Sequence, residues 1–426
     1  MWQRHLTSIF LYIFIFSFSK VCAEPLELNL DAQAAILVNA DTGRILYEKD
    51  ADKLLYPAST TKIATALYAL KVKGLELEEN VIAQQDSIGS VSWSEKVKSH
   101  FTLPAHWIEH GSSHIGIKRG ERLSFKTLLY ALMVASGNDA ANVIGQFVSG
   151  DVPTFMNEVN AYLNEIGCKN THYKNPHGLH HPKHQTTARD LVLMTREALK
   201  DPVFRNLVLT KRYTRPKTNM QEPMVMVQTN RLIKKGSTYY YPKAIGVKTG
   251  YTGEAGYNLV AAAKDQGRTL IAVVLKCKDR GDTFENVKKM FEKAFNQTKM
   301  RRRLLKEGMQ NLSLNLEGAA QPLKTYIQDE VGVDYFPAEE PTIEAHVQWQ
   351  DLTLPISKGQ RVGEIKLYSN DNSFVKFVPL LALEEVKPTF WFSMKRLWNG
   401  NSQFFLGSIF FLGSSAFSYI VYRKKK

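Results

Sequence analysis

The sequence predicts a mixed α+β protein in which an antiparallel sheet is flanked by helices, with an all-helical lobe, a small β-rich domain after it and a C-terminal membrane anchor. Strand-like patterns at the start of the chain and at residues 243–277 enclose a long region of helical periodicity. The 426 residues exceed one ordinary domain, which indicates two or three units. With 44% hydrophobic and 23% charged residues, the composition is that of a globular protein.

The first predicted elements are a hairpin and a helix. Two strand-like runs, 35–38 and 44–47, flank Asp41-Thr42-Gly43, whose residues favour a tight turn. Pro57 then precedes a helix expected from Ser59 to about Lys71, because apolar side chains recur there at helical spacing. Further helices are expected at residues 124–133 and near 139–149, 153–166 and 187–199.

Residues 243–296 are predicted to complete the sheet and to close the first domain. Strands are expected at 243–249, 256–263 and 269–276, and the polar loop 264–268 reads as a hairpin connection. A helix near 282–296 follows the last of these strands. We therefore expect the first domain to span residues 24–298.

A second, β-rich domain is predicted over residues 299–389. The basic stretch Lys299–Lys306 is interpreted as a solvated linker, with attraction to anionic lipid or polymer as the alternative. Beyond it, short strands alternate with Gly, Pro and Asn turns, for example at 342–347, 363–368 and 374–378. This stretch carries no recognisable catalytic pattern.

Residues 1–23 are predicted to be a secretory signal peptide. A short basic start at Arg4 and His5 precedes an apolar core at 9–18, and Val21-Cys22-Ala23 has the small-x-small pattern of a cleavage site. The apolar core is shorter than the roughly 20 residues of a spanning helix. We therefore expect the mature chain to begin at Glu24 and to be exported.

Residues 390–426 are predicted to form an aromatic juxtamembrane segment and an anchor. The stretch 404–422 has no charge for 19 residues, which is near the roughly 20 residues that a spanning helix requires. A basic tail follows, and a helix lying in the membrane interface is the alternative. The predicted location is the outer face of the cytoplasmic membrane, on the periplasmic side if the envelope has an outer membrane. The aromatic side chains expected at the interface are Phe390, Trp391, Phe392 and Trp398.

Charge and cysteine content narrow the function classes. The net charge is +14, and six of these charges lie in the terminal segments, which leaves +8 for the body. A mildly basic body suits work beside anionic envelope polymers, and without zinc-finger spacing or a long basic stripe nucleic acid is not an expected partner. Cys22, Cys168 and Cys277 are single and far apart, so we expect no disulfide framework.

Three short motifs occur in order within the first predicted domain. Ser59-Thr60-Thr61-Lys62 is an S-x-x-K, Ser136-Gly137-Asn138 an S-x-N, and Lys248-Thr249-Gly250 a K-T-G. Each is weak alone, since the chain also has an S-x-x-K at 17–20 and an S-x-N at 313–315. Singly, each also fits a helix cap, a helix end or a strand followed by a turn. Their order and context together indicate a nucleophilic serine site.

The chemistry of these residue types agrees with that interpretation. Residues three apart in a helix share a face, so Lys62 is expected to reach Ser59 and to act as the base that a serine nucleophile needs. The helix start favours developing negative charge. Burial and a neighbouring cation such as Lys248 would lower the pKa of Lys62 toward the working range of a general base. Lys248 and Thr249, at a strand end, can hold a substrate carboxylate.

The chain resembles the low-molecular-mass penicillin-binding proteins, which are serine-type D-alanyl-D-alanine carboxypeptidases. The resemblance spans roughly residues 28–297. Beyond the three motifs it rests on Ala35-Ile36-Leu37-Val38, Pro57-Ala58, Asp139-Ala140, Asn175-Pro176-His177-Gly178-Leu179, Thr187-Ala188-Arg189-Asp190-Leu191, Thr229-Asn230-Arg231-Leu232 and Ala255-Gly256-Tyr257.

This resemblance implies a penicillin-binding transpeptidase-like (β-lactamase-like) fold and removal of the terminal D-alanine from peptidoglycan pentapeptide stems. Ser59 would form the acyl-enzyme, Lys62 would be the general base, Ser136 would shuttle a proton and Asn138 would contact the substrate. The stem peptide ending in D-Ala-D-Ala would be the substrate, and β-lactams would be covalent inhibitors at Ser59. No cofactor is implied.

The K-T-G residues Lys248, Thr249 and Gly250 would bind the terminal carboxylate by the same resemblance. A D,D-endopeptidase or a serine β-lactamase on the same fold remains an alternative, although no E-x-x-L-N supplies a deacylating glutamate. A catalytically idle envelope-binding protein is the non-enzymatic alternative, and three intact motifs argue against it.

Residues 92–114 depart from the family pattern, because the stretch between the first two motifs is longer than is usual. It carries Trp93, Phe101, Trp107 and four histidines. The family pattern therefore does not predict the substrate-binding rim of this chain. A second group of histidines lies at 177–184. No nearby Cys or Glu completes a clean set of zinc ligands with either group, so we expect no metal site.

Overall fold

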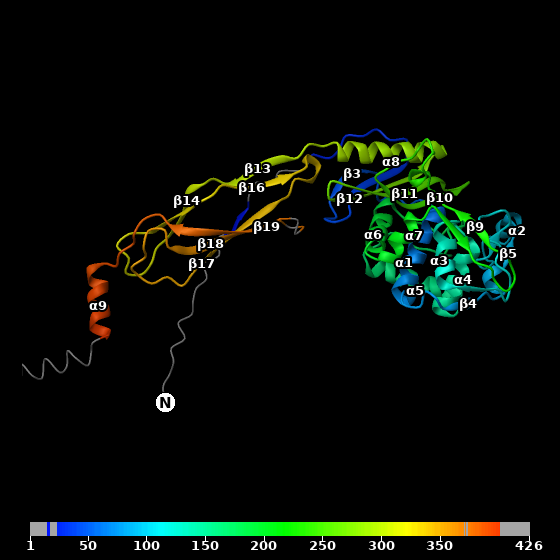
Figure 1. Ribbon diagram of the computed structural model, residues 1–426, viewed down its shortest axis with the longest axis horizontal. Coiled ribbons are helices and arrows are strands. Elements are labelled where there is room, and N and C mark those ends of the chain that lie inside the picture. Colours follow the sequence, from blue (N-terminus) through cyan, green and yellow to red (C-terminus); the bar gives the residue numbers. More distant parts are fainter. Residues whose placement is uncertain (1–14, 18–23, 370, 372–373, 401–426) are drawn as a thin grey trace, which may run out of the picture. The chain divides into compact units, whose positions relative to one another are not determined.

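The structure is a computed structural model, and it describes residues 15–17, 24–369, 371 and 374–400 (Figure 1). The chain divides into two compact units. The larger unit comprises Ala23–Thr298 together with the short segment Phe336–Glu339, and the smaller unit comprises Met1–Cys22, Lys299–Tyr335 and Glu340–Lys426.

A five-stranded antiparallel sheet lies at the centre of the larger unit, with the strand order β10-β11-β12-β2-β3. Both faces of the sheet are buried. In β2, Ile36 and Val38 contribute to one hydrophobic core, whereas Ala35 and Leu37 contribute to a second core on the other face. This explains why these strands read as continuous apolar runs rather than as an alternation. The strands are β2 (Ala34–Asn39), β3 (Ile45–Lys49), β10 (Ala244–Thr252), β11 (Gly256–Asp265) and β12 (Arg268–Cys277).

Helices cover both faces of this sheet, as the sequence predicted. Helix α8 (Arg280–Phe295) packs on one face, and a helical lobe packs on the other (Figure 1). Asp201, followed by Pro202, caps one lobe helix that was not predicted, since its carboxylate accepts hydrogen bonds from two backbone N–H groups. The lobe consists of α1 (Lys62–Lys73), α3 (Phe125–Met133), α4 (Asn138–Ser149), α5 (Val152–Glu165), α6 (Ala188–Ala198) and α7 (Pro202–Leu209).

The predicted helix at Ser59 starts differently from the expectation. Residues Ala58–Thr61 form a 3-10 turn, η1, and the α-helix begins only at Lys62. Ala58 has a φ of 48°, and the hydroxyls of Thr60 and Thr61 donate back to the carbonyl oxygens of Pro57 (2.8 Å) and Ala58 (2.9 Å). These local bonds hold the tighter turn at the N-terminal start of the helix.

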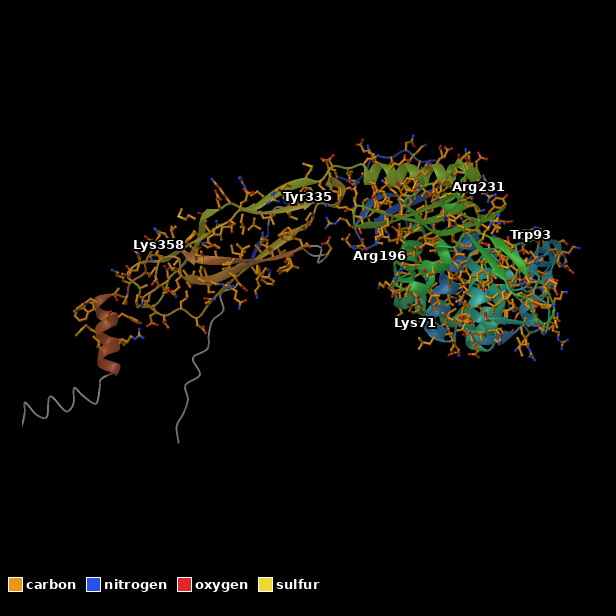
Figure 2. The ribbon with its side chains drawn as sticks, in the orientation of Figure 1. Lys71, Trp93, Arg196, Arg231, Tyr335 and Lys358 are labelled. Atoms are coloured by element: carbon orange, nitrogen blue, oxygen red, sulfur yellow. The ribbon has the colours of Figure 1, made fainter. Side chains whose placement is uncertain are left out.

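Short elements at the rim of the larger unit were not predicted. Trp93, at the start of α2, is exposed at the surface (Figure 2). These elements are too short for a pattern to be read from sequence. They are β4 (Asn80–Ile82), η2 (Asp86–Ile88), β5 (Ser90–Val91), α2 (Trp93–Lys98), β6 (Ile108–Glu109), β7 (Arg122–Ser124), β8 (Arg212–Arg215), β9 (Met224–Val227), η3 (Arg231–Ile233) and η4 (Pro337–Glu339).

The smaller unit is β-rich around its own core. Its main sheet has six strands in the order β1-β17-β18-β19-β15-β14, and β13 pairs separately with β16. The strands are β1 (Ile15–Ser17), β13 (Met300–Leu305), β14 (Gly308–Leu314), β15 (Leu323–Ile327), β16 (Val331–Tyr335), β17 (Ile343–Trp349), β18 (Arg361–Ser369) and β19 (Val375–Ala382).

The interpretation of 299–306 as a solvated linker is wrong, because most of this segment is strand β13. Leu304 is buried in the core of the smaller unit, while the arginines lie on more exposed positions. Arg302 pairs with Glu340 at 2.6 Å, and Arg301 pairs with Asp334 at 3.4 Å. The charge run therefore forms an edge strand with acidic partners, which a count of charges does not reveal.

The chain beyond residue 389 begins with helix α9 (Phe390–Gly400). Phe390 and Trp391 are exposed (70% and 81%), whereas Phe392 packs against the core of the smaller unit. The Trp398 side chain, the predicted anchor 404–422 and most of the predicted signal peptide lie outside the described residues. Among the helices that are described, none combines the length and the apolar character needed to cross a bilayer.

Candidate active site

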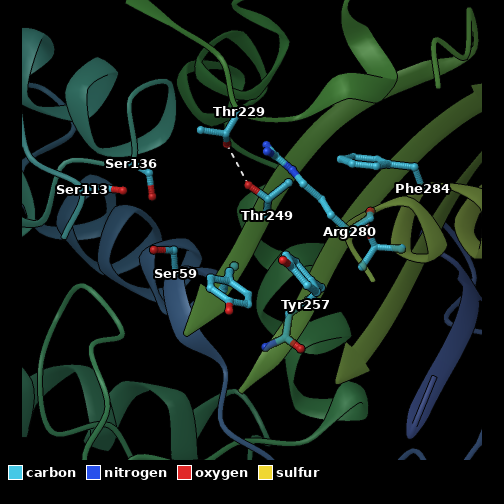
Figure 3. A pocket seen from close by; sticks show the side chains of 12 residues that line it. Ser59, Ser113, Ser136, Thr229, Thr249, Tyr257, Arg280 and Phe284 are labelled. Carbon is cyan, nitrogen blue, oxygen red and sulfur yellow. Dashed lines mark hydrogen bonds between the residues drawn. The ribbon is translucent and has the colours of Figure 1, made fainter. Parts of the chain in front are cut away.

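A cavity of about 340 Å³ opens in the larger unit and brings the three motifs together (Figure 3). Its walls come from η1, the residues that precede α4, strands β10 and β11, and the start of α8. The lining residues are Ser59, Ser113, Ser136, Thr229, Thr249, Gly250, Tyr251, Tyr257, Asn258, Arg280, Thr283 and Phe284.

Ser59 lies on a turn that β10 and β11 hold in place. Asn258 Nδ2 donates to the carbonyl oxygens of Tyr56 (2.9 Å) and Pro57 (3.0 Å), and its Oδ1 accepts from the backbone of β12 (2.7 Å). A Cβ at Gly250 would lie 2.8 Å from the oxygen of Pro57 and 3.0 Å from the nitrogen of Ser59. Glycine at this position therefore lets β10 pass directly beside the serine turn.

Lys62 is fully buried beneath Ser59, and its ammonium nitrogen has three oxygen neighbours. Nζ lies 2.9 Å from Ser59 Oγ, 2.7 Å from Asn138 Oδ1 and 2.8 Å from the carbonyl oxygen of His177. The amide and backbone oxygens can only accept, so a neutral amine must donate its two hydrogens to them. Its lone pair then faces the hydroxyl of Ser59, which is the arrangement that a base requires.

The surroundings of Lys62 favour that neutral form. Burial lowers the pKa of Lys62 well below its ordinary value, the charge of Lys248 lowers it further, and the buried carboxylate of Asp139 acts in the opposite direction. Asp139 itself accepts hydrogen bonds from the backbone N–H groups of Ile115 and Ile117. Lys248 was expected from the sequence to be the perturbing cation, and here its effect comes second to that of burial.

The second motif divides between the wall and the interior. Ser136 lines the cavity and has a φ of 61°, a left-handed conformation that is uncommon for a residue with a side chain. Asn138 is buried and does not line the cavity, since its Oδ1 accepts from Lys62 and its Nδ2 donates to Ser112 Oγ (3.1 Å). The structure thus places Asn138 as a partner of Lys62.

The K-T-G motif also has one residue, Lys248, that is buried and does not line the cavity. Lys248 is fully buried, and its Nζ donates to the carbonyl oxygen of Thr249 at 3.0 Å. Burial lowers the pKa of Lys248 to about 7. Thr249 reaches the cavity, and its hydroxyl lies 2.8 Å from that of Thr229.

We expect Lys248→Met to stabilise the fold by about 1–3 kcal/mol at pH 6, because a buried ammonium is replaced by an apolar side chain of similar length. Because the folded-state pKa of Lys248 is about 7, the folded protein loses this proton as the pH rises through that value. The unfolded chain keeps the proton until the pH reaches the ordinary lysine range, so the two states differ in protonation between these limits. The stability of the native protein therefore rises through this window, and the advantage of the variant shrinks. Urea unfolding at pH 6, 8 and 10 measures this effect.

The exposed Lys264→Met serves as the matched control and is expected to change stability by no more than about 0.5 kcal/mol. An advantage of Lys248→Met that is absent at pH 6, or that grows toward pH 10, would contradict burial as the cause of the lowered pKa.

Several cavity residues were not singled out from the sequence. Thr229 and Tyr257 fall in segments that resemble the family, but nothing in the pattern assigned them to the site. Arg280 and Phe284, at the start of α8, carried no motif at all. Arg280 is the one cationic side chain among the twelve lining residues, and its guanidinium points toward the Thr229–Thr249 pair (Figure 3).

The inserted segment 92–114 packs on the loop that carries His177. The rings of Trp93 and Phe101 lie 6.0 and 5.6 Å from that of His180. His177 accepts from the backbone N–H of Leu179 through Nδ1, so its Nε2 carries the hydrogen that it donates to the carbonyl oxygen of residue 106 (3.0 Å). Burial keeps the pKa of His177 well below the ordinary value. Across the described residues, no three His, Cys, Asp or Glu side chains are grouped in a way that could hold a metal ion.

Known proteins are similar to this chain in both sequence and fold. The profile of the D-alanyl-D-alanine carboxypeptidase family matches residues 20–279, and that of the penicillin-binding protein 5 C-terminal domain matches residues 336–388. The D-alanyl-D-alanine carboxypeptidase DacF of Bacillus subtilis is 32% identical over 365 residues, which cover 85% of this chain and 87% of the relative. DacC of Escherichia coli is 29% identical over 404 residues, covering 91% and 92%.

Among solved structures, penicillin-binding protein 6B of Escherichia coli matches with a TM-score of 0.58 and 26% identity, over 84% of this chain and 97% of that protein. The family profile covers more than half of the chain and includes all three motifs. The chain therefore belongs to the D-alanyl-D-alanine carboxypeptidase family, with a penicillin-binding transpeptidase-like fold followed by a C-terminal domain of the penicillin-binding protein 5 type.

Proposed function

We propose that this protein is a serine-type D-alanyl-D-alanine carboxypeptidase that removes the terminal D-alanine from peptidoglycan pentapeptide stems. One observation carries the proposal: the buried nitrogen of Lys62 lies 2.9 Å from Ser59 Oγ at the wall of a cavity, with its remaining hydrogens committed to two acceptors. Such a pair is equipped to activate a serine hydroxyl. Family membership identifies the bond that this serine attacks.

Acylation follows from the positions of the polar groups. Lys62 accepts the proton of Ser59 while Oγ attacks the carbonyl carbon between the two terminal D-alanines. The backbone N–H groups of Ser59 and Tyr251, which border the close contact at Gly250, stabilise the oxyanion. Ser136, on the cavity wall, passes a proton to the amine of the departing D-alanine. Water then hydrolyses the ester and restores the Ser59 hydroxyl.

The terminal carboxylate is recognised by the wall of the cavity that carries Thr249 and Arg280. Thr249 supplies a hydroxyl and Arg280 a guanidinium, both of which line the cavity. Lys248 is buried just behind Thr249, so we assign it a long-range electrostatic role that strengthens when a bound carboxylate favours its protonated form. Asn138 orients Lys62 rather than the substrate. β-Lactams carry a carboxylate in the equivalent place, so they should acylate Ser59.

We further propose that the protein is exported and held at the outer face of the cytoplasmic membrane by its C-terminus. The basis is the signal-like pattern of residues 1–23 and the uncharged stretch 404–422. The exposed Phe390 and Trp391 of α9 are side chains suited to the membrane interface. In this proposal the chain comprises a catalytic domain at 24–298, a β-rich domain at 299–389 and a juxtamembrane and anchor segment at 390–426.

The test is D-alanine release from a diacyl-Lys-D-Ala-D-Ala peptide by the purified full-length protein, together with labelling by a fluorescent penicillin. We expect catalytic release of D-alanine and a penicillin adduct that is lost slowly. Rapid hydrolysis of penicillin without D-alanine release would instead identify a serine β-lactamase. If the protein bound peptidoglycan but neither released D-alanine nor formed the adduct, it would be an idle binding protein.

A further inference from the structure

We propose that Thr229 is a positioning residue for carboxylate recognition: its hydroxyl donates to Thr249 and thereby keeps the hydrogen of the Thr249 hydroxyl available for the substrate carboxylate. The inference rests on the proposed function and adds a residue to it. Thr229 lies outside the three motifs, two residues beyond the end of β9, and it lines the cavity next to Thr249 (Figure 3).

The Thr229–Thr249 contact joins two parts of the site that have no common sheet. β9 pairs with β8 in a separate two-stranded sheet, whereas Thr249 belongs to β10 of the five-stranded sheet. The two hydroxyl oxygens lie 2.8 Å apart, which is a normal hydrogen-bond length. The bond therefore fixes the Thr249 side chain against a wall that its own strand does not supply.

The neighbours of Thr229 set the direction of this hydrogen bond. Gln228 Oε1 already accepts from the backbone N–H groups of Thr229 (2.8 Å) and Asn230 (3.3 Å). The Thr229 hydroxyl lies 3.4 Å from that oxygen but 2.8 Å from Thr249 Oγ1. The shorter contact and the already occupied amide oxygen favour donation from Thr229 to Thr249.

The direction matters because a carboxylate only accepts hydrogen bonds. With the bond running from Thr229 to Thr249, the single hydrogen of Thr249 remains for the substrate. With the opposite direction, that hydrogen would be spent inside the wall and a lone pair would face the carboxylate. A donor that itself accepts a hydrogen bond is also polarised by it, which strengthens its own donation. Arg280, whose guanidinium points to the same pair, supplies the charge (Figure 3).

The test compares Thr229→Val, which keeps the shape and removes the hydroxyl, with Thr229→Ser, which retains it. Each full-length variant is assayed with diacyl-Lys-D-Ala-D-Ala and with the same peptide ending in D-alaninamide. We expect Thr229→Val to lower kcat/KM for the carboxylate peptide by about five- to tenfold, with little change for the amide. Thr229→Ser should stay within about twofold of the native protein.

A double-mutant cycle separates positioning from a general loss of structure. In a Thr249→Val background, Thr229→Val is expected to have no further effect on the carboxylate peptide, because its partner hydroxyl is already absent. Thr195→Val is the control. It removes a buried threonine hydroxyl of α6 that donates to a helix carbonyl at 2.6 Å, away from the cavity, and should leave the carboxylate preference unchanged. Thermal melting of each variant monitors folding.

Equal losses for both peptides, or additive effects of the two threonine substitutions, would overturn the proposal. A second readout is the rate at which Ser59 is acylated by benzylpenicillin and by its methyl ester. The ratio of the benzylpenicillin rate to the ester rate should fall in Thr229→Val. If the native protein released no D-alanine, the proposed function would fail, and this ratio would still decide the role of Thr229. An unchanged ratio would refute that role.

Discussion

Replacing Ser59 by alanine is expected to abolish penicillin labelling and to reduce D-alanine release by about five orders of magnitude or more. The reason is geometric, because Ser59 is the hydroxyl that lies 2.9 Å from the nitrogen of Lys62 and also lines the cavity. Removing Oγ leaves the base without a proton to accept and the substrate without a nucleophile. Gel fluorescence with a labelled penicillin and a D-alanine assay measure the two effects.

The sequence itself provides the control for this experiment. Ser313 begins an S-x-N in β14 of the smaller unit, so Ser313→Ala removes a motif serine that lies far along the chain from the cavity. We expect the Ser313→Ala variant to be labelled by penicillin and to release D-alanine at the native rate. Persistent labelling of Ser59→Ala would identify another nucleophile, with Ser136 the first candidate because it lines the same cavity. Circular dichroism then establishes that the alanine variant is folded.

The contacts of the first motif could be predicted from sequence because they are local. The spacing of Ser59 and Lys62 implies one helix face, and the tighter η1 turn leaves that proximity intact. The strands of the central sheet were predictable for a similar reason, since each is a run of apolar residues ended by turn residues.

Features that depend on long-range packing could not be predicted. The motif predicts a substrate contact for Asn138, and it gives no sign that Asn138 Oδ1 accepts a hydrogen bond from Lys62, which lies 76 positions earlier in the chain. Arg280 reaches the cavity because α8 packs across β11 and β12, and a helix start has no sequence signal for the pocket that it will face. The strand β13 was missed for a related reason, as the acidic partners of Arg301 and Arg302 come 33 and 38 residues later in the chain, at Asp334 and Glu340.

Lys62→Arg is expected to lower the rate of Ser59 acylation by about 10²- to 10⁴-fold, although the hydrogen-bond donors are retained. A guanidinium stays protonated throughout the accessible pH range, so it can still donate to Asn138 and to the carbonyl of His177 but cannot accept the Ser59 proton. Lys71→Arg, on the exposed side of the same helix, is the matched control and should acylate at the native rate. Stopped-flow acylation by a chromogenic cephalosporin gives the rates.

The pH dependence distinguishes loss of a base from loss of packing. Because only the neutral amine accepts a proton, the native acylation rate should rise with pH through the pKa of Lys62, which burial places well below the ordinary lysine range. Lys62→Arg should lack this rise. Lys248, with a pKa of about 7, titrates nearby, so the profile of Lys248→Met decides the assignment: it should keep a rising limb at lower overall rate. A rise that survives in Lys62→Arg, or that disappears in Lys248→Met, would remove Lys62 from the role of base.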